Sequence, residues 1–75
     1  MSERAIKVIE GLEQATGKEK VTEDMVFGKD IIITSVNAMK LSFDLENALD
    51  IDCIPPDIFY DVQTVADLIK VVESL

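Results

Sequence analysis

A chain of 75 residues can form one domain, which we expect to span residues 1–75, and it is too short for a deep enclosed pocket beside a core. Hydrophobic residues make up 48%, enough for a compact core, while 7 basic against 15 acidic side chains give a net charge of −8. This charge argues against nucleic acid and anionic membranes as partners and favours proteins with basic surfaces.

The first expected helix spans about residues 2–15. Its apolar residues fall at helical spacing and form the stripe Ala5, Ile6, Ile9, Leu12 and Ala15. Gly17 is expected to end it. The apolar residues of segment 21–33 show neither helical nor strand periodicity, so we predict a long, partly ordered connection that contacts the core through Val21, Met25 and Phe27. The apolar run 31–33 has strand propensity but no partner strand, and it is far shorter than the ~18 residues of a membrane span, so we expect no stable membrane insertion.

The strongest helical signal covers residues 35–49, with Ser35 or Thr34 suited to the N-cap. One stripe, assigned to the core, consists of Ala38, Leu41, Leu45, Ala48 and Leu49. A second stripe on roughly the opposite side consists of Val36, Met39 and Phe43. A helix that is apolar on two sides needs two contacts. The second stripe is therefore either a contact surface for partners or a loaded group, or it is covered by neighbouring loops, with Met39 the member best suited to the core.

Pro55 and Pro56 end any preceding helix, and residues 56–60 can form only one or two short turns. The last helix begins at Thr64, which with Asp67 forms a capping-box pattern. It runs to about Glu73 with the apolar stripe Val65, Leu68, Ile69 and Val72. We therefore predict an all-α fold, a small four-helix bundle with three longer helices, one short third helix and a long first loop.

Little in the sequence points to catalysis. The chain has no His, which is the usual general base at neutral pH. General acid–base catalysis also needs a site shielded from solvent, which a chain of this length can barely form, so we do not expect an enzyme. Asp50, Asp52 and Asp57 lack the remaining ligands of a calcium loop, so we interpret them as a solvated acidic loop and expect no metal. The single Cys53 excludes an internal disulfide, and its acidic neighbour favours a small core residue over a reactive thiol.

The region around Ser35 carries a pattern of a different kind. Phe27, Asp30, Ile31, Ser35 and Val36 stand in register, without gaps, with Phe, two residues, Asp-Leu-Gly, one residue, Asp-Ser-Leu. This pattern resembles the acyl carrier protein family, including the carrier domains of polyketide and peptide synthases. Further along, residues 45–46 resemble the end of the family's second helix, and residues 54–55 and 58–65 its third helix and the start of its fourth. The resemblance covers nearly the whole chain.

The resemblance implies a carrier function. A phosphopantetheinyl transferase would attach 4′-phosphopantetheine from coenzyme A to the Ser35 hydroxyl, and the thiol of the arm would hold an acyl or aminoacyl group as a thioester. Such carriers serve fatty-acid, lipid, polyketide and related secondary-metabolite biosynthesis, in which other enzymes perform the chemistry. We expect a cytoplasmic monomer whose acyl-loading and acyl-processing enzymes have basic surfaces. The residues expected to contact them are Val36, Met39, Phe43, Glu46, Asp30 and Asp57.

The chain also departs from the family pattern. Thr34 stands where the family has Asp before the serine, Ile32 replaces its Gly, and Val36 replaces its Leu. Helix positions that are commonly acidic in the family hold Asn37, Lys40 and Asn47. Because Lys40 would repel a basic surface, we infer a specialised carrier with dedicated partners. The alternative is an acidic helical interaction module with the carrier fold that is never modified, and Thr34 favours it.

Overall fold

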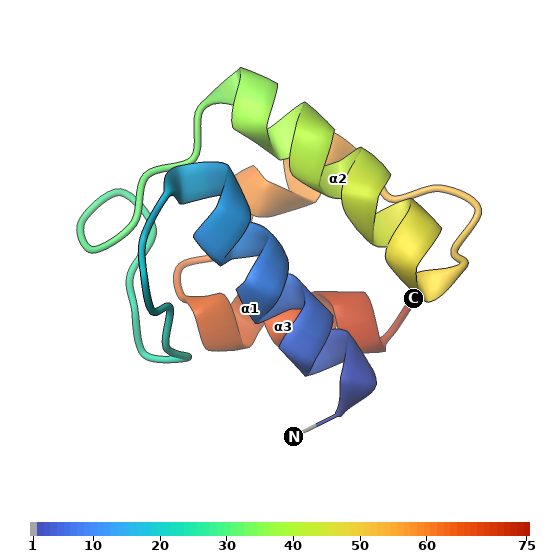
Figure 1. Ribbon diagram of the computed structural model, residues 1–75, viewed down its shortest axis with the longest axis horizontal. Helices are drawn as coiled ribbons and strands as arrows, with labels where there is room; N and C mark the ends of the chain where they lie inside the picture. The colour runs from blue at the N-terminus through green and yellow to red at the C-terminus, as the bar shows by residue number, and fades with distance from the viewer. Residues whose placement is uncertain (1) are drawn as a thin grey trace.

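The computed structural model describes residues 2–75 and is built from helices and loops (Figure 1). Its elements are the α-helices α1 (Glu3–Thr16), α2 (Ser35–Leu49) and α3 (Val65–Glu73), and the 3₁₀ helix η1 (Pro56–Tyr60). The prediction of a small all-helical domain is confirmed. The finer description as a four-helix bundle is not, since residues 2–75 contain three α-helices and the expected third helix is a five-residue 3₁₀ segment.

Capping groups set the helix ends close to where the sequence predicts them. Gly17 adopts a left-handed conformation with φ 77° and donates its N–H to the Glu13 carbonyl at the end of α1. At the start of α2 the N-cap is Thr34, whose hydroxyl accepts a hydrogen bond from the Asn37 N–H at 3.1 Å. Thr64 and Asp67 form the predicted capping box of α3.

The core lies between the three α-helices and η1, with α1 packed against both α2 and α3. It includes all four predicted residues of α3 and, from the first two helices, Ala5, Val8, Leu12, Ala38, Leu41 and Leu45. The stripe predicted for α1 is wrong at one position, because Ile6 is exposed and Val8 is buried in its place. The reason is that α1 packs against both α2 and α3, so its buried face is the line that points between them. In α2, Ala48 is exposed, contrary to its assignment to the core.

The long first loop, residues 17–34, is anchored at several points along one end of the helices (Figure 1). Val21 is buried and donates its N–H to the Glu13 carboxylate at 3.0 Å. Met25 and Phe27 are half-buried against the core and bond through their backbones to Val65 at the start of α3 and to Gln63 before it, so the predicted core contacts are confirmed. The apolar run 31–33 forms no strand; within residues 2–75 only isolated bridges occur, at 26–64 and 27–31.

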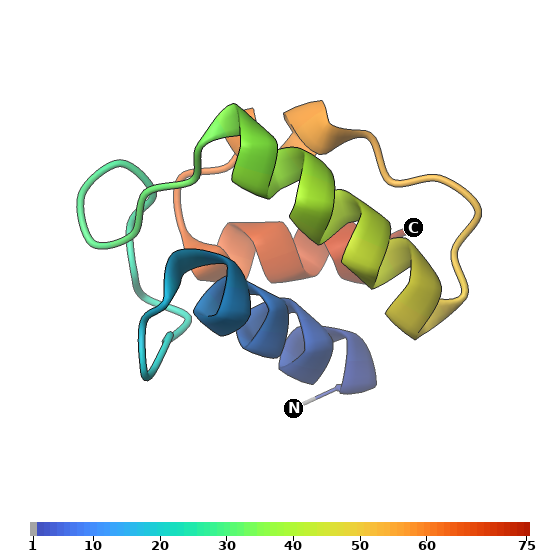
Figure 2. The ribbon, with the colours of Figure 1, turned by 45° about the horizontal axis from the view of Figure 1, so that its top comes forward.

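The loop between α2 and η1 is held by two side chains of α2. The Ser42 hydroxyl donates a hydrogen bond to the Ile54 carbonyl, and the Glu46 carboxylate accepts one from the Ile54 N–H at 2.7 Å. This clamp turns Ile54 into the core and leaves Cys53 exposed. The prediction that Cys53 is a small core residue is therefore wrong. Figure 2 shows the result, with η1 lying alongside the first turns of α2.

The α-helices of the structure are 14, 15 and 9 residues long. None of those formed within residues 2–75 combines the length and apolar character needed to cross a membrane.

Candidate functional site

Ser35 is the first residue of α2 and its side chain is exposed. Thr34 before it caps the helix, and its hydroxyl and carbonyl accept hydrogen bonds from Asn37 and Ala38. The first amides of an α-helix have no acceptor within the helix, which here leaves those of Ser35 and Val36 directed outward. The first turn of α2 contains no acidic residue. The positive end of the helix dipole is therefore not neutralised by a carboxylate in its own first turn.

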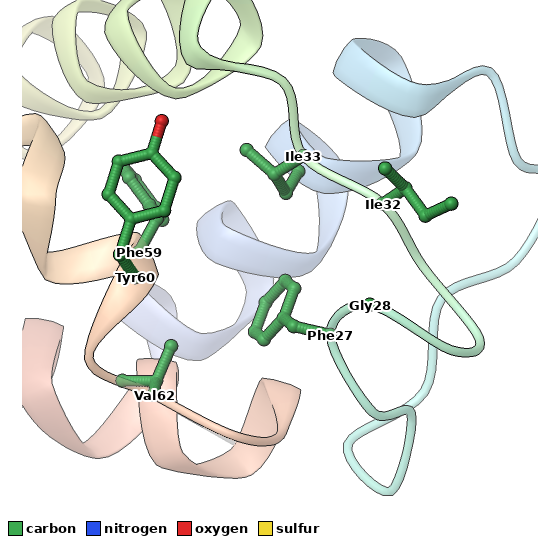
Figure 3. Close-up of a pocket in the computed structure, with 7 residues that line it drawn as sticks. All are labelled: Phe27, Gly28, Ile32, Ile33, Phe59, Tyr60 and Val62. Atoms are coloured by element: carbon green, nitrogen blue, oxygen red, sulfur yellow. The ribbon is translucent and has the colours of Figure 1, made fainter.

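A surface pocket of about 250 Å³ lies between the first loop and η1, near the start of α2. Its walls are mainly apolar and are formed by Phe27, Gly28, Ile32, Ile33, Phe59, Tyr60 and Val62 (Figure 3). Figure 3 shows Phe27 and Ile33 on one side and Phe59 and Val62 on the other, with the Tyr60 hydroxyl pointing toward α2. Ile33 precedes Ser35 by two residues, so a group attached to the Ser35 hydroxyl lies within roughly 7 Å of one pocket wall along the backbone.

Sequence reasoning did not assemble this pocket. The sequence singles out Phe27 as a core contact and motif residue and Ile32 as a departure from the family pattern, but assigns neither to a pocket; the structure leaves Phe27 half-buried at the pocket wall. The pocket walls come from the first loop and from η1 with the residue Val62 after it, which are far apart in the chain. Backbone hydrogen bonds between the first loop and residues 63–65 bring these segments together. In that pairing the Phe27 N–H donates to the Gln63 carbonyl at 2.9 Å, and the Val65 N–H donates to the Met25 carbonyl at 3.0 Å.

The second apolar stripe of α2 is exposed along its length. The exposed fractions are 73% for Val36 and 64% each for Met39 and Phe43. Neighbouring loops do not cover these side chains, so that alternative, and the placement of Met39 in the core, are wrong. The reason is that the buried face of α2 is centred on Leu41 and Leu45. At about 100° per residue, the stripe residues point well away from this face.

The three acidic residues predicted to contact partners come from three different elements. Asp30 is exposed in the first loop, and its carboxylate accepts a hydrogen bond from the Val26 N–H at 2.9 Å. Asp57 is exposed in the first turn of η1. Glu46 is half-buried and already accepts the Ile54 N–H. The structure thus leaves Asp30 and Asp57 accessible and gives Glu46 a role within the fold.

Ser42 was missed by sequence reasoning. It is the only buried polar residue found among residues 2–75, and it lies on the core face of α2 one turn before Glu46. The signal was present in the sequence, because a serine directly follows Leu41 within the predicted core stripe. For metals, no group of three or more acidic or cysteine side chains within residues 2–75 is arranged to hold an ion.

Comparisons of the chain with protein-family models, with curated proteins and with solved structures give no match in any of the three cases. The function proposed below therefore depends on the geometry of this site and on the resemblance in sequence.

Proposed function

We propose that the protein is an acyl carrier protein that holds an acyl or aminoacyl group as a thioester on 4′-phosphopantetheine attached to Ser35. The biosynthesis it serves would be that of fatty acids, other lipids, polyketides or related secondary metabolites. One observation carries the proposal: the Ser35 hydroxyl, which stands at the motif position, is exposed at the N-terminus of a 15-residue helix. An enzyme can reach such a hydroxyl without unfolding any part of the chain.

The residues around Ser35 fit a phosphodiester. The outward amides of Ser35 and Val36 and the positive end of the α2 dipole favour an anion at this position. The apolar walls of the neighbouring pocket, with the Tyr60 hydroxyl as a polar group, suit an arm with alternating amide and methylene segments. When bound, the arm supplies the thiol for the thioester. The chain itself contributes the hydroxyl, the anion environment and the tether, which raises the effective concentration of the loaded group at a docked enzyme.

The arrangement of the elements supports the same proposal. With η1 counted as a short third helix, three longer helices, one short helix and a long first loop follow the order expected for a four-helix carrier. Its partners would be a phosphopantetheinyl transferase and acyl-loading and acyl-processing enzymes. Exposed Asp30 and Asp57 can meet basic groups on them, whereas Lys40 on α2 disfavours a basic surface at that point. We therefore propose a specialised, monomeric, cytoplasmic carrier.

Intact mass spectrometry tests the attachment. Incubation with coenzyme A and a broad-specificity phosphopantetheinyl transferase should add the mass of one phosphopantetheine group. Ser35→Ala should abolish the addition. Ser74→Ala is the matched control, because Ser74 is also exposed but lies at a helix C-terminus, and it should be converted like the native chain. An unchanged mass of the native chain, while a reference carrier is converted in the same mixture, would overturn the proposal.

A second candidate is an acidic helical interaction module that keeps the carrier fold but is never modified. The observation that favours it is Thr34, which serves as a helix cap where the family has an acidic residue. The variant Thr34→Asp separates the two candidates, since Asp is also a good N-cap and should leave α2 intact. Conversion of Thr34→Asp but not of the native chain would support the module.

A further inference from the structure

The first two helices, with the loops that leave them, repeat one sequence pattern at a distance of 33 residues. Residues 2–21 and 35–54, called the repeat segments below, can be aligned without gaps. The identical pairs are Ser2 and Ser35, Ala5 and Ala38, Lys7 and Lys40, Leu12 and Leu45, Glu13 and Glu46, and Ala15 and Ala48. The two segments can therefore be compared position by position in the structure.

The structures of the repeat segments agree with this alignment. Gly17 and Asp50 are equivalent, and both adopt the left-handed conformation at the end of their helix. Val21 and Ile54 are also equivalent, and both are buried. Each donates its N–H to the carboxylate of the shared glutamate eight residues earlier. The equivalence thus extends from the helices into the loops that follow them.

Ser2 shows the state of the shared serine when it caps its helix. It is the N-cap of α1, with an extended backbone at φ −70° and ψ 162°. Its hydroxyl accepts a hydrogen bond from the Ala5 N–H at 3.1 Å and donates one to the Glu73 carboxylate. A capping hydroxyl is turned back toward the helix amides and has a lone pair engaged there. Such an oxygen is poorly placed to attack an external group.

Thr34, not Ser35, caps α2. The equivalence with Ser2 predicts Ser35 as the N-cap, but α2 begins one residue earlier than this alignment implies. Thr34 has the extended backbone of a cap, at φ −78° and ψ 164°, and its hydroxyl accepts the Asn37 N–H at 3.1 Å. In the first segment the preceding residue is Met1, which has no hydroxyl. The residue before the serine therefore decides which side chain serves as the cap.

Attachment of phosphopantetheine uses the Ser35 hydroxyl as a nucleophile. Its oxygen forms a bond to the phosphorus of the pantetheine phosphate, the pyrophosphate bond of coenzyme A breaks, and the adenosine bisphosphate leaves. The serine proton passes to a base of the transferase. In the N-cap position this oxygen would instead accept the Ala38 N–H, as Ser2 accepts that of Ala5, and would have to release this bond before it could attack.

We propose that Thr34 is a positioning residue for this transfer: by capping α2 it keeps the Ser35 hydroxyl out of the cap and free to attack. The inference rests on the proposed carrier function and assigns a role to the residue before the attachment site. When the Thr34 hydroxyl is removed, α2 begins one residue later with Ser35 as its cap, because serine is among the preferred N-cap residues.

The rate of attachment tests this role. Thr34→Val keeps the shape of the side chain without its hydroxyl. With coenzyme A and a broad-specificity phosphopantetheinyl transferase, its kcat/KM should fall about 10-fold, because only the minor population with a free Ser35 hydroxyl reacts. Thr34→Asn restores a cap without a new hydroxyl and should react within about 2-fold of the native chain. Thr22→Val is the matched control, because the Thr22 hydroxyl bonds to Asp24 within the first loop, and it should keep the native rate.

A cycle of stability measurements detects the change of cap without the transferase. In the native chain Ser35→Ala should change Tm by less than about 3 °C, because Thr34 caps α2. In the Thr34→Val background the same substitution removes the new cap and should lower Tm by roughly 4–8 °C. Ser2→Ala is the reference, since it removes the equivalent cap of α1 and should lower Tm by a similar amount.

The outcomes separate this inference from the proposed function. If the native chain is modified and Thr34→Val reacts at the native rate, the inference fails and the carrier function stands. Slow attachment that Thr34→Asn does not restore, or an equal effect of Ser35→Ala on Tm in both backgrounds, would also overturn the inference, because Thr34 would then act by a route other than the cap. An unmodified native chain beside a converted reference carrier would overturn both.

Discussion

The clamp between α2 and the loop after it gives a stability prediction that can be worked out from the structure. Both backbone polar groups of Ile54 are satisfied by side chains of α2, the carbonyl by Ser42 and the N–H by Glu46. Ser42 is 3% exposed and Ile54 is 1% exposed, so water does not replace a lost partner. The substitution Ser42→Ala removes one hydroxyl and leaves the Ile54 carbonyl without a donor in the interior.

The expected cost follows from burial. An unsatisfied buried polar group costs about 1–3 kcal/mol, so we expect Ser42→Ala to lower the free energy of unfolding by about 2 kcal/mol. Ser74 provides the control, because its hydroxyl makes the same type of bond, to the Val71 carbonyl at 2.7 Å, at an exposed position. Ser74→Ala should change stability by less than about 0.5 kcal/mol. For a domain of this size, about 2 kcal/mol lowers Tm by roughly 8–16 °C.

The stability of both variants is measured by thermal and urea unfolding, each monitored by far-UV circular dichroism. Amide hydrogen exchange adds a local readout: the amides of residues 51–60 should exchange faster in Ser42→Ala than in Ser74→Ala, because the clamp joins α2 to η1. Equal stability of the two serine variants, within about 0.5 kcal/mol, would refute the reasoning that burial of the bond determines its contribution.

Two further substitutions test the packing and the caps. In Gly11→Ala the new Cβ would lie 2.5 Å from Cδ1 of Leu41, which is buried. The cost of overpacking, about 1–3 kcal/mol, should outweigh the gain of about 1 kcal/mol in helix propensity, so the variant should be less stable in urea unfolding. Net stabilisation would show that Leu41 can move aside. Thr64→Ala removes the acceptor for the Asp67 N–H, which is one half of the capping box, so Tm should fall by roughly 4–8 °C in a calorimetric scan. A change below about 1 °C would contradict the importance of the cap.

Local sequence signals account for most of the secondary structure. The predicted bounds of α2 match those observed, and α1 and α3 agree within one residue or so, because a helix end depends on a few neighbouring residues. Gly17 can adopt a left-handed conformation with little strain, and the spacing of Thr64 and Asp67 allows their side chains to cap α3. The stripe of α3 is also predicted correctly, since an amphipathic helix with one apolar side has one face to bury.

Choices between apolar residues were decided only by tertiary structure. On α1, Ile6 and Val8 lie about 160° apart, to either side of the line through Ala5 and Leu12, and packing of α1 against both α2 and α3 selects Val8. In the same way, two sides of α2 are apolar in sequence, and the positions of α1 and η1, which pack against α2, decide that Met39 remains outside. Burial requires a neighbour, and a helix alone does not specify where its neighbours lie.

The candidate site likewise combines features that local sequence determines with features that only the tertiary structure decides. The sequence by itself determined that Ser35 begins a helix and stands in a carrier-like pattern, because caps and motifs are local. The tertiary structure decided that Ile54 rather than Cys53 enters the core, that Glu46 serves the fold, and that a pocket forms near Ser35. These features depend on hydrogen bonds and contacts between residues far apart in the chain. Such contacts exist only once the helices have packed.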